Sequence, residues 1–354
     1  MASDLGHNLA RELARWRPPQ GVVSAYVHID PGDRGGGWRI GLRDALAGAD
    51  EDAARRVLRR FEDDAPPSGR TQIGFVEVDG DRREIWHGVQ LELGRTEVVQ
   101  ASRPHLAPLM RILDQGWPVG VVVLALERIR VLEWRLAEIS ELAGWELELT
   151  DLDWRERKAP QRNPQAGGTG AGAAGRDQHA QRLEQNRESF LKHAGHLLVA
   201  RYGERPWRRV IVIGANDRPK LFVAGMGGRA ELAHEVPHDL IGAGATAIGE
   251  RVGEEVEHLN RSREEELIAR LESAVNAKRG AAFGPEKVDE ALEQARVRHL
   301  IFDATRDWAR HDGVALVDPM IERALDTDAE VTPVDGLAAS SLSSHGGVAA
   351  LLRY

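Results

Sequence analysis

The 354-residue sequence contains no cysteine. This absence excludes disulfide bonds, zinc ribbons, iron–sulfur clusters and thiol catalysis, and it fits a reducing compartment. The sequence also lacks a long apolar run, because the longest one, Val119 to Leu126, is far shorter than the ~20 residues of a membrane helix. The start, Met-Ala-Ser-Asp-Leu, has neither the basic region nor the apolar core of a secretory signal. We therefore expect a cytoplasmic protein without a membrane anchor.

Positive charge is in the minority, since 47 Lys and Arg residues face 56 Asp and Glu residues and give a net charge of −9. A nucleic-acid partner would therefore have to be bound by a local basic patch. One segment qualifies, because between residues 155 and 176 five basic residues accompany one acidic residue, a local charge of +4. The basic residues are Arg155, Arg157, Lys158, Arg162 and Arg176. The same segment is rich in glycine and proline, which predicts a mobile basic loop over residues 155–178.

The length predicts two or three domains, and 42% hydrophobic with 29% charged residues is typical of a globular protein. Alternating strand patterns, a hairpin signal at Asp79-Gly80 and helical patterns over residues 42–61 and 104–113 predict an α+β N-terminal domain, residues 1–153. A central α/β domain, residues 154–258, is predicted to carry the loop, a helix and strands at 209–213 and 221–224. Helices and strands then alternate through residues 259–354, with a first helix predicted over 261–277 and a strand over 314–317, which predicts an α/β sandwich.

Two motifs suggest cofactor chemistry but lack the context it needs. His234-Glu-Val-Pro-His238 matches the zinc-protease pattern, yet Pro237 prevents the continuous helix on which both histidines would have to lie. Gly170-Ala-Gly-Ala-Ala-Gly175 matches the dinucleotide fingerprint, but a Pro/Gln/Gly tract precedes it where a strand is required. The sequence also has no phosphate-binding G-K-[ST] motif. We therefore assign no metal and no cofactor, and keep a nucleotide-dependent oxidoreductase only as an alternative of another class.

The helix that follows the loop is amphipathic. Apolar residues recur at helical spacing from Leu183 to Leu198, and Arg182 and Gln185 lie off that apolar face. Composition alone leaves two interpretations of the preceding loop open. It is either a plain interdomain linker, or a cationic probe whose glycines allow the backbone to approach RNA closely.

The central segment resembles the archaeal and eukaryotic class I release factors with their Pelota and bacterial relatives. In that family a Gly-Gly-Gln loop precedes a helix patterned Q-x3-R-x2-R-x-R, followed by a strand of the type V-x-G-L-V-L-A-G. Here Gln178 stands at the glutamine, Arg182 and Arg187 match the first and third arginines, and Gln185 replaces the second. The strand is similar to Val210-Ile-Val-Ile-Gly214. Farther on, residues 282–301 and 346–354 resemble two C-terminal segments of the family.

The resemblance implies a three-domain factor that enters the ribosomal A site, with the loop directed at the peptidyl-transferase centre. The implied partners are ribosomal RNA and peptidyl-tRNA, with a translational GTPase as a further candidate. It implies a catalytic role for Gln178 in hydrolysing the peptidyl-tRNA ester, and RNA contacts by Arg155, Arg157, Lys158, Arg162, Arg176, Arg182 and Arg187. Arg176-Asp177 replaces the two glycines, so both a release or rescue role and a non-hydrolytic hibernation or stress role stay open.

Overall fold

The computed structural model describes residues 5–30, 32, 36–61, 69–79, 83–147, 155–156, 173–276, 280–311 and 313–354. The chain divides into two compact units. Unit 1 consists of Met1–Gly116 and Val256–Tyr354, and unit 2 consists of Trp117–Glu255. Most of the predicted basic loop, residues 157–172, lies outside the described residues.

The N-terminal part of unit 1 is an antiparallel sheet in the order β3-β2-β1-β4. Its strands are β1 (Val22–His28), β2 (Thr71–Glu77), β3 (Glu84–Val89) and β4 (Glu97–Ala101). The predicted hairpin of β2 and β3 is confirmed, and Asp79 takes the left-handed backbone conformation (φ 59°) that its turn requires. The helices α1 (His7–Arg15), α2 (Gly37–Ala45) and α3 (Glu51–Arg59) belong to this part. Apolar side chains of β1, α2 and α3 form one core cluster.

The C-terminal part of unit 1 has a mixed sheet in the order β11-β16-β12-β15. Its strands are β11 (Ala281–Phe283), β12 (Val297–Asp303), β15 (Glu330–Val334) and β16 (Val348–Leu352), and β12 pairs parallel to β15. The short strands β13 (Arg310–His311) and β14 (Val314–Ala315) pair separately. The helices are α8 (Pro285–Glu293), α9 (Val317–Asp326) and α10 (Gly336–Ser343), and Leu267 and Leu271 of α7 (Ala245–Asn276) reach the same core as Ile301.

Unit 2 is built on a sheet in the order β10-β9-β5-β6-β7-β8. Its strands are β5 (Val119–Leu124), β6 (Arg128–Arg135), β7 (Glu138–Glu146), β8 (Arg155–Glu156), β9 (Arg209–Gly214) and β10 (Ala233–Val236). β5 pairs antiparallel to β6 and parallel to β9. The sheet thus joins β5–β7 to β9, across the boundary that the sequence analysis drew at residue 153. The two units and their sheets confirm the predicted mixed α+β class.

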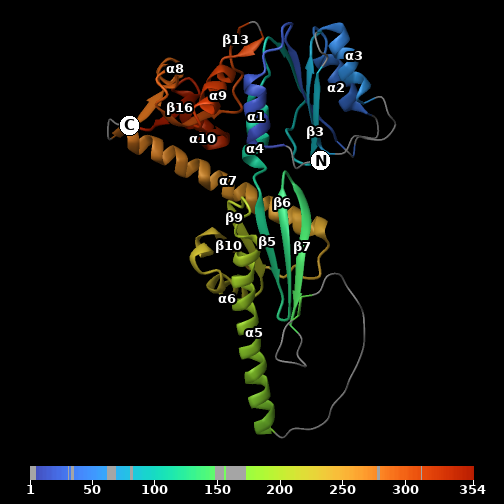
Figure 1. The fold of residues 1–354 in the computed structure, drawn as a ribbon, viewed down its shortest axis with the longest axis vertical. Helices are drawn as coiled ribbons and strands as arrows, with labels where there is room; N and C mark the ends of the chain where they lie inside the picture. Colours follow the sequence, from blue (N-terminus) through green and yellow to red (C-terminus); the bar gives the residue numbers. More distant parts are fainter. Residues whose placement is uncertain are drawn as a thin grey trace. The chain divides into compact units, whose positions relative to one another are not determined.

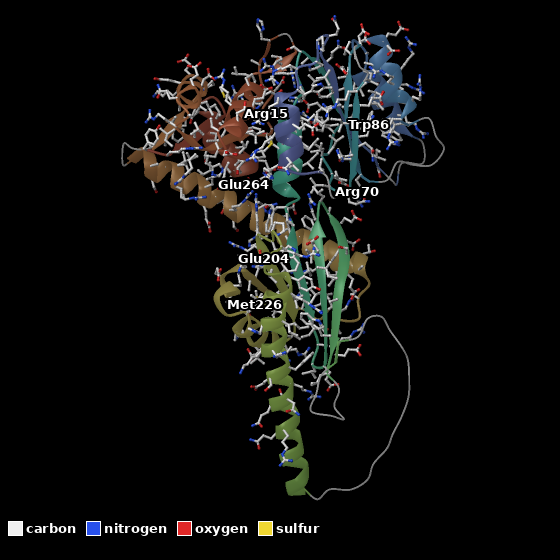
Figure 2. All side chains as sticks on the ribbon, viewed as in Figure 1. Arg15, Arg70, Trp86, Glu204, Met226 and Glu264 are labelled. Carbon is white, nitrogen blue, oxygen red and sulfur yellow. The ribbon has the colours of Figure 1, made fainter. Side chains whose placement is uncertain are left out.

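Two helices of unit 2, α5 (Ala173–Tyr202) and α6 (Arg218–Gly225), meet at two glycines. A β-carbon at Gly195 would overlap the carbonyl oxygen of Phe222, and one at Gly225 would overlap the carbonyl oxygen of Lys192. The helix backbones therefore approach more closely than any side chain at these positions would allow. A short 3-10 helix (Gly227–Leu232) follows, and Met226, labelled in Figure 2, is buried in the unit 2 core.

Several predicted elements are wrong or differ in extent. The predicted strand Leu221 to Ala224 is part of the helix α6, because Pro219 in its first turn favours a helix start and Phe222 turns into the core. The single helix predicted over 42–61 is two helices, since Gly48 (φ 123°) interrupts it and the Asp50 carboxylate accepts a hydrogen bond from the Ala53 N–H of α3. Only two residues of the predicted strand 314–317 are extended, because Val317 begins α9.

Two further helices differ from prediction in where they begin. α7 starts at Ala245 rather than at Arg261, and α5 starts at Ala173, within the segment predicted as loop. Among the helices described, none is both long enough and apolar enough to cross a membrane.

Candidate functional site

Helix α5 has an anchored half and a projecting half. In the anchored half Phe190, Leu191, Ala194 and Leu198 are buried in the unit 2 core, which confirms most of the predicted apolar stripe. Toward the N-terminus the helix continues past the ends of strands β5 to β7 (Figure 1). Residues 181, 182 and 184–186 are exposed there. The side chains at these positions are therefore accessible to solvent.

Helical periodicity divides the projecting half into two faces. Gln178, Arg182, Gln185 and Ser189 follow at spacings of four, three and four residues, so they share one face of α5. Arg182, Gln185 and Ser189 are exposed, and Lys192 and His196 extend the same exposed face. We call these six residues the outer stripe. It brings together the two residues of the family pattern, Gln178 and Arg182, that the sequence analysis singled out.

Arg187 lies on the opposite face, about 180° around the helix from Gln178 at 100° per residue. Its guanidinium contacts the Glu127 carboxylate in the turn between β5 and β6 at 2.6 Å and the Glu184 carboxylate at 3.7 Å. The hydrogen bond to Glu127 raises the pKa of Arg187 above its usual value. Arg187 therefore fastens α5 to the sheet, and two carboxylates offset its charge. No ion pair joins Arg182 to another residue that the structure describes.

The remaining predicted residues are distributed between two elements and the undescribed segment. Arg155 begins β8, where its backbone pairs with Glu146 of β7. Arg176 and Gln178 lie in the first two turns of α5. Arg157, Lys158 and Arg162 lie outside the described residues.

The helical backbone at Gln178 limits what its N–H group can bind. Only the first four N–H groups of a helix lack an intrahelical acceptor, and Gln178 is the sixth residue of α5. Its N–H is therefore directed at the carbonyl oxygen one turn earlier rather than at a ligand. A backbone N–H at this position can stabilise an oxyanion only after the first turns of α5 unwind.

Unit 1 contains a buried polar cluster that the sequence analysis missed. His105 Nδ1 lies 2.7 Å from Asp318 Oδ2, and His105 Nε2 lies 3.1 Å from Glu97 Oε1. The other Asp318 oxygen accepts hydrogen bonds from the backbone N–H groups of Leu106 and Ala107, at 3.0 and 3.2 Å. These two amides open helix α4 (Ala107–Gln115). Asp318, in the first turn of α9, thus caps α4 from 211 residues away in sequence.

The charges in this cluster stabilise one another. Burial alone would lower the pKa of His105, but Asp318 and Glu97 outweigh it and raise this pKa to about 9. The hydrogen bond from His105 lowers the pKa of Glu97 to about 2. At neutral pH the cluster therefore holds an imidazolium between two carboxylates. Because both ring nitrogens are engaged, His105 serves as a structural cation and not as a general base.

A second buried carboxylate strengthens the same junction. Glu322 of α9 accepts hydrogen bonds from Arg17 at 2.6 Å and from Arg103 at 2.8 Å. The side chain of Glu322 is 5% exposed, so two arginines compensate its desolvation. Together with His105 and Asp318, this network joins α9 to the segment between β4 and α4.

The histidines of the zinc-protease motif do not share a helix. His234 lies in the strand β10, and its Nε2 is 3.0 Å from Glu255 Oε2. His238 lies two residues beyond the end of that strand. Within the described ranges, no group of three or more His, Asp or Glu side chains is arranged to hold a metal ion.

Comparison with known proteins gives a family match for the middle of the chain. Residues 104–257 match the model of the family described as bacterial archaeo-eukaryotic release factor family 10. No curated protein sequence matches the chain.

Solved structures give more distant similarities. A model of ribosome-bound archaeal Pelota and ABCE1 matches at 14% identity and a TM-score of 0.47, covering 98% of this chain and 93% of that one. Dom34 of S. cerevisiae matches at 11% identity and a TM-score of 0.46, covering 80% of each chain. Pelota of Archaeoglobus fulgidus matches at 17% identity and a TM-score of 0.36, covering 80% and 79%.

Proposed function

Because residues 104–257 carry the sequence of the bacterial archaeo-eukaryotic release factor family 10, we propose that this protein acts on the ribosome as a release- or rescue-like translation factor. The family match confirms the resemblance for the central segment. The proposal for the whole protein is that unit 2 enters the A site, with α5 and the basic segment before it directed toward the peptidyl-transferase centre.

The outer stripe of α5 is the observation that supports this proposal. It combines two cations, Arg182 and Lys192, with hydrogen-bonding side chains at Gln178, Gln185 and Ser189, and its N-terminal residues lie on the part of α5 that projects from its core. Arginine and amide side chains bind phosphate and sugar oxygens without requiring a base sequence. The protein is acidic overall, with a net charge of −9, so this contact has to be local and sensitive to salt.

Co-sedimentation with purified ribosomes at several salt concentrations tests the proposal. Arg182→Ala should weaken binding and reduce the slope of log affinity against log salt by roughly one unit, the contribution of one phosphate contact. Arg298→Ala is the matched control, since Arg298 is an exposed arginine on β12 of unit 1. Wild-type protein that stays unbound at low salt would refute the proposal. A slope that Arg182→Ala leaves unchanged would remove the outer stripe from the interface.

A non-hydrolytic role, in which the protein occupies the A site during hibernation or stress, is the second candidate. The observation that favours it is the helical backbone at Gln178, which occupies the N–H that hydrolysis would use. In this role the outer stripe and the basic segment bind RNA, and no bond is broken.

Release of labelled peptide from stalled ribosome–peptidyl-tRNA complexes distinguishes the two roles. If Gln178 is catalytic, Gln178→Ala should lower the release rate by about 10²–10³, the effect of one preorganised donor, while ribosome binding persists. Tight binding by wild type without release would favour the non-hydrolytic role. Replacing Arg176 and Asp177 by glycine should then create release activity, because each glycine weakens this helical turn by ~1 kcal/mol and frees its backbone.

Two further expectations belong to the same proposal. The protein is expected in the cytoplasm, where ribosomes are, and a translational GTPase is a candidate partner. A nucleotide-dependent oxidoreductase stays an alternative of another class, and a bound cofactor that absorbs light in the purified protein would favour it.

A further inference from the structure

An arginine-lined cleft in unit 1 lies beside the His105 cluster. Its water-accessible volume is about 60 Å³, within a hollow of about 600 Å³ that includes the open solvent at its mouth. Its four arginines come from three segments: Arg95 precedes β4, Arg111 lies on α4, and Arg306 and Arg310 follow β12. We call this the arginine cleft. It belongs neither to the outer stripe nor to unit 2.

Acidic side chains balance only part of the charge in the arginine cleft. The Glu97 carboxylate lies 3.4 Å from Arg95 and 3.0 Å from Arg310, and it also contacts His105. A single carboxylate thus faces three cations, because the pKa of His105 is about 9 and its imidazole is charged at neutral pH.

The other two arginines of the cleft are weakly neutralised. Arg111 meets Asp335 at 3.4 Å, and its Nε is buried without a hydrogen-bond partner among the described residues. Arg306 is exposed and lies over the Trp308 ring at 5.5 Å, and no ion pair joins it to another described residue. Asp307 adds one exposed carboxylate at the rim. With Asp335 beside Arg111 and Asp318 beside His105, five cations face four carboxylates, and Arg306 is the cation without an ion pair to a described residue.

The chemistry and size of the arginine cleft indicate its ligand. Planar guanidinium groups bind two oxygens of a phosphate at once, which makes arginine the preferred residue for phosphate recognition. The water-accessible volume of about 60 Å³ limits the ligand to a small anion rather than a nucleotide, and α4 and the segment between β12 and β14 line this space. We infer that the arginine cleft binds a small phosphate-bearing anion. This inference is independent of the proposed ribosomal function.

Calorimetric titration of the full-length protein with pyrophosphate, at fixed ionic strength, tests the inference. Wild type should bind with one site per chain, and Arg306→Gln should weaken binding by about tenfold or more, the effect of losing one charge-assisted contact. Arg306→Lys should retain part of the affinity, since it keeps the charge but not the planar fork. Arg298→Gln should bind as wild type does, because Arg298 is exposed elsewhere in unit 1.

Three results would overturn the inference. Wild type that gives no heat with pyrophosphate would show that the arginine cleft is not a phosphate site. Equal weakening by Arg306→Gln and Arg298→Gln would indicate a nonspecific charge effect. Displacement of bound pyrophosphate by a short RNA oligonucleotide would assign the cleft to an RNA backbone instead.

Discussion

Raising the pH from 7 to 9 should lower the free energy of unfolding of unit 1, because the side chain of His105 loses its proton. The pKa of His105 is about 9 in the folded protein and 6.5 when unperturbed. The folded state therefore binds the proton more tightly, so the associated stability is fully present below pH 6.5 and is lost as the pH rises through 9. A difference of this size corresponds to about 3 kcal/mol. Because His105 is buried, solvent screens little of this energy.

Urea unfolding followed by tryptophan fluorescence, at pH 7 and pH 9, measures this loss. Wild type should lose most of the ~3 kcal/mol between these values. His105→Gln should be less stable at pH 7, because the Asp318 carboxylate is left without its cation, and it should lack the decline toward pH 9. His311→Gln, at an exposed position of the same unit, should decline as wild type does. A wild type with equal stability at both pH values would refute the reasoning, and so would a His105→Gln protein that keeps the decline.

Two further predictions concern packing and burial. Gly225→Ala should lower the free energy of unfolding of unit 2 by about 1–3 kcal/mol, because its methyl group would overlap the Lys192 carbonyl. Gly253→Ala, in α7 with open space around it, should instead raise the free energy of unfolding by ~0.5–1 kcal/mol. Thermal melts that rank the two variants the other way would contradict this packing. Burial raises the pKa of Glu264, labelled in Figure 2, to about 7, so this carboxyl favours the folded state most below pH 4.5 and loses that effect as the pH rises through 7. Glu264→Gln should therefore raise the melting temperature at pH 8, and a lower melting temperature would exclude that explanation.

Local sequence signals explain which elements could be predicted. The strand β1 shows a period of two, and the β2–β3 hairpin depends on a turn dipeptide whose first residue, Asp79, has the expected positive φ. The helix α6 was missed because Leu221 to Ala224 is a short apolar run, which fits a buried strand as well as a helix. Pro219 in the first turn favours the helix, and the close contact of Gly225 with α5 is a tertiary feature that fits only this helix packing.

The outer stripe and the His105 cluster differ in whether local sequence signals could predict them. Arg182 and Gln185 of the outer stripe could be predicted because both lie on one helix, where spacing alone determines the face. The His105–Asp318 pair spans 213 residues, and neither residue belongs to a recognisable motif. The ion pair of Arg187 with Glu127 is equally nonlocal, since 60 residues separate them. Sequence spacing carries no information about such pairs, so the fold has to be known first.

Because α5 is one uninterrupted helix, a small tilt of its anchored half moves its N-terminal residues by a larger distance. The buried segment of α5 begins at Phe190, and Gln178 lies 12 residues away along the same helix, about 18 Å at 1.5 Å per residue. A tilt of about 10° at Phe190 would move Gln178 by about 3 Å, which is enough to make or break contact with a bound partner. The Arg187–Glu127 ion pair and the Gly195–Gly225 crossing restrain that tilt. Substitutions at these two contacts should therefore change the position of Gln178 without altering the residues of the outer stripe.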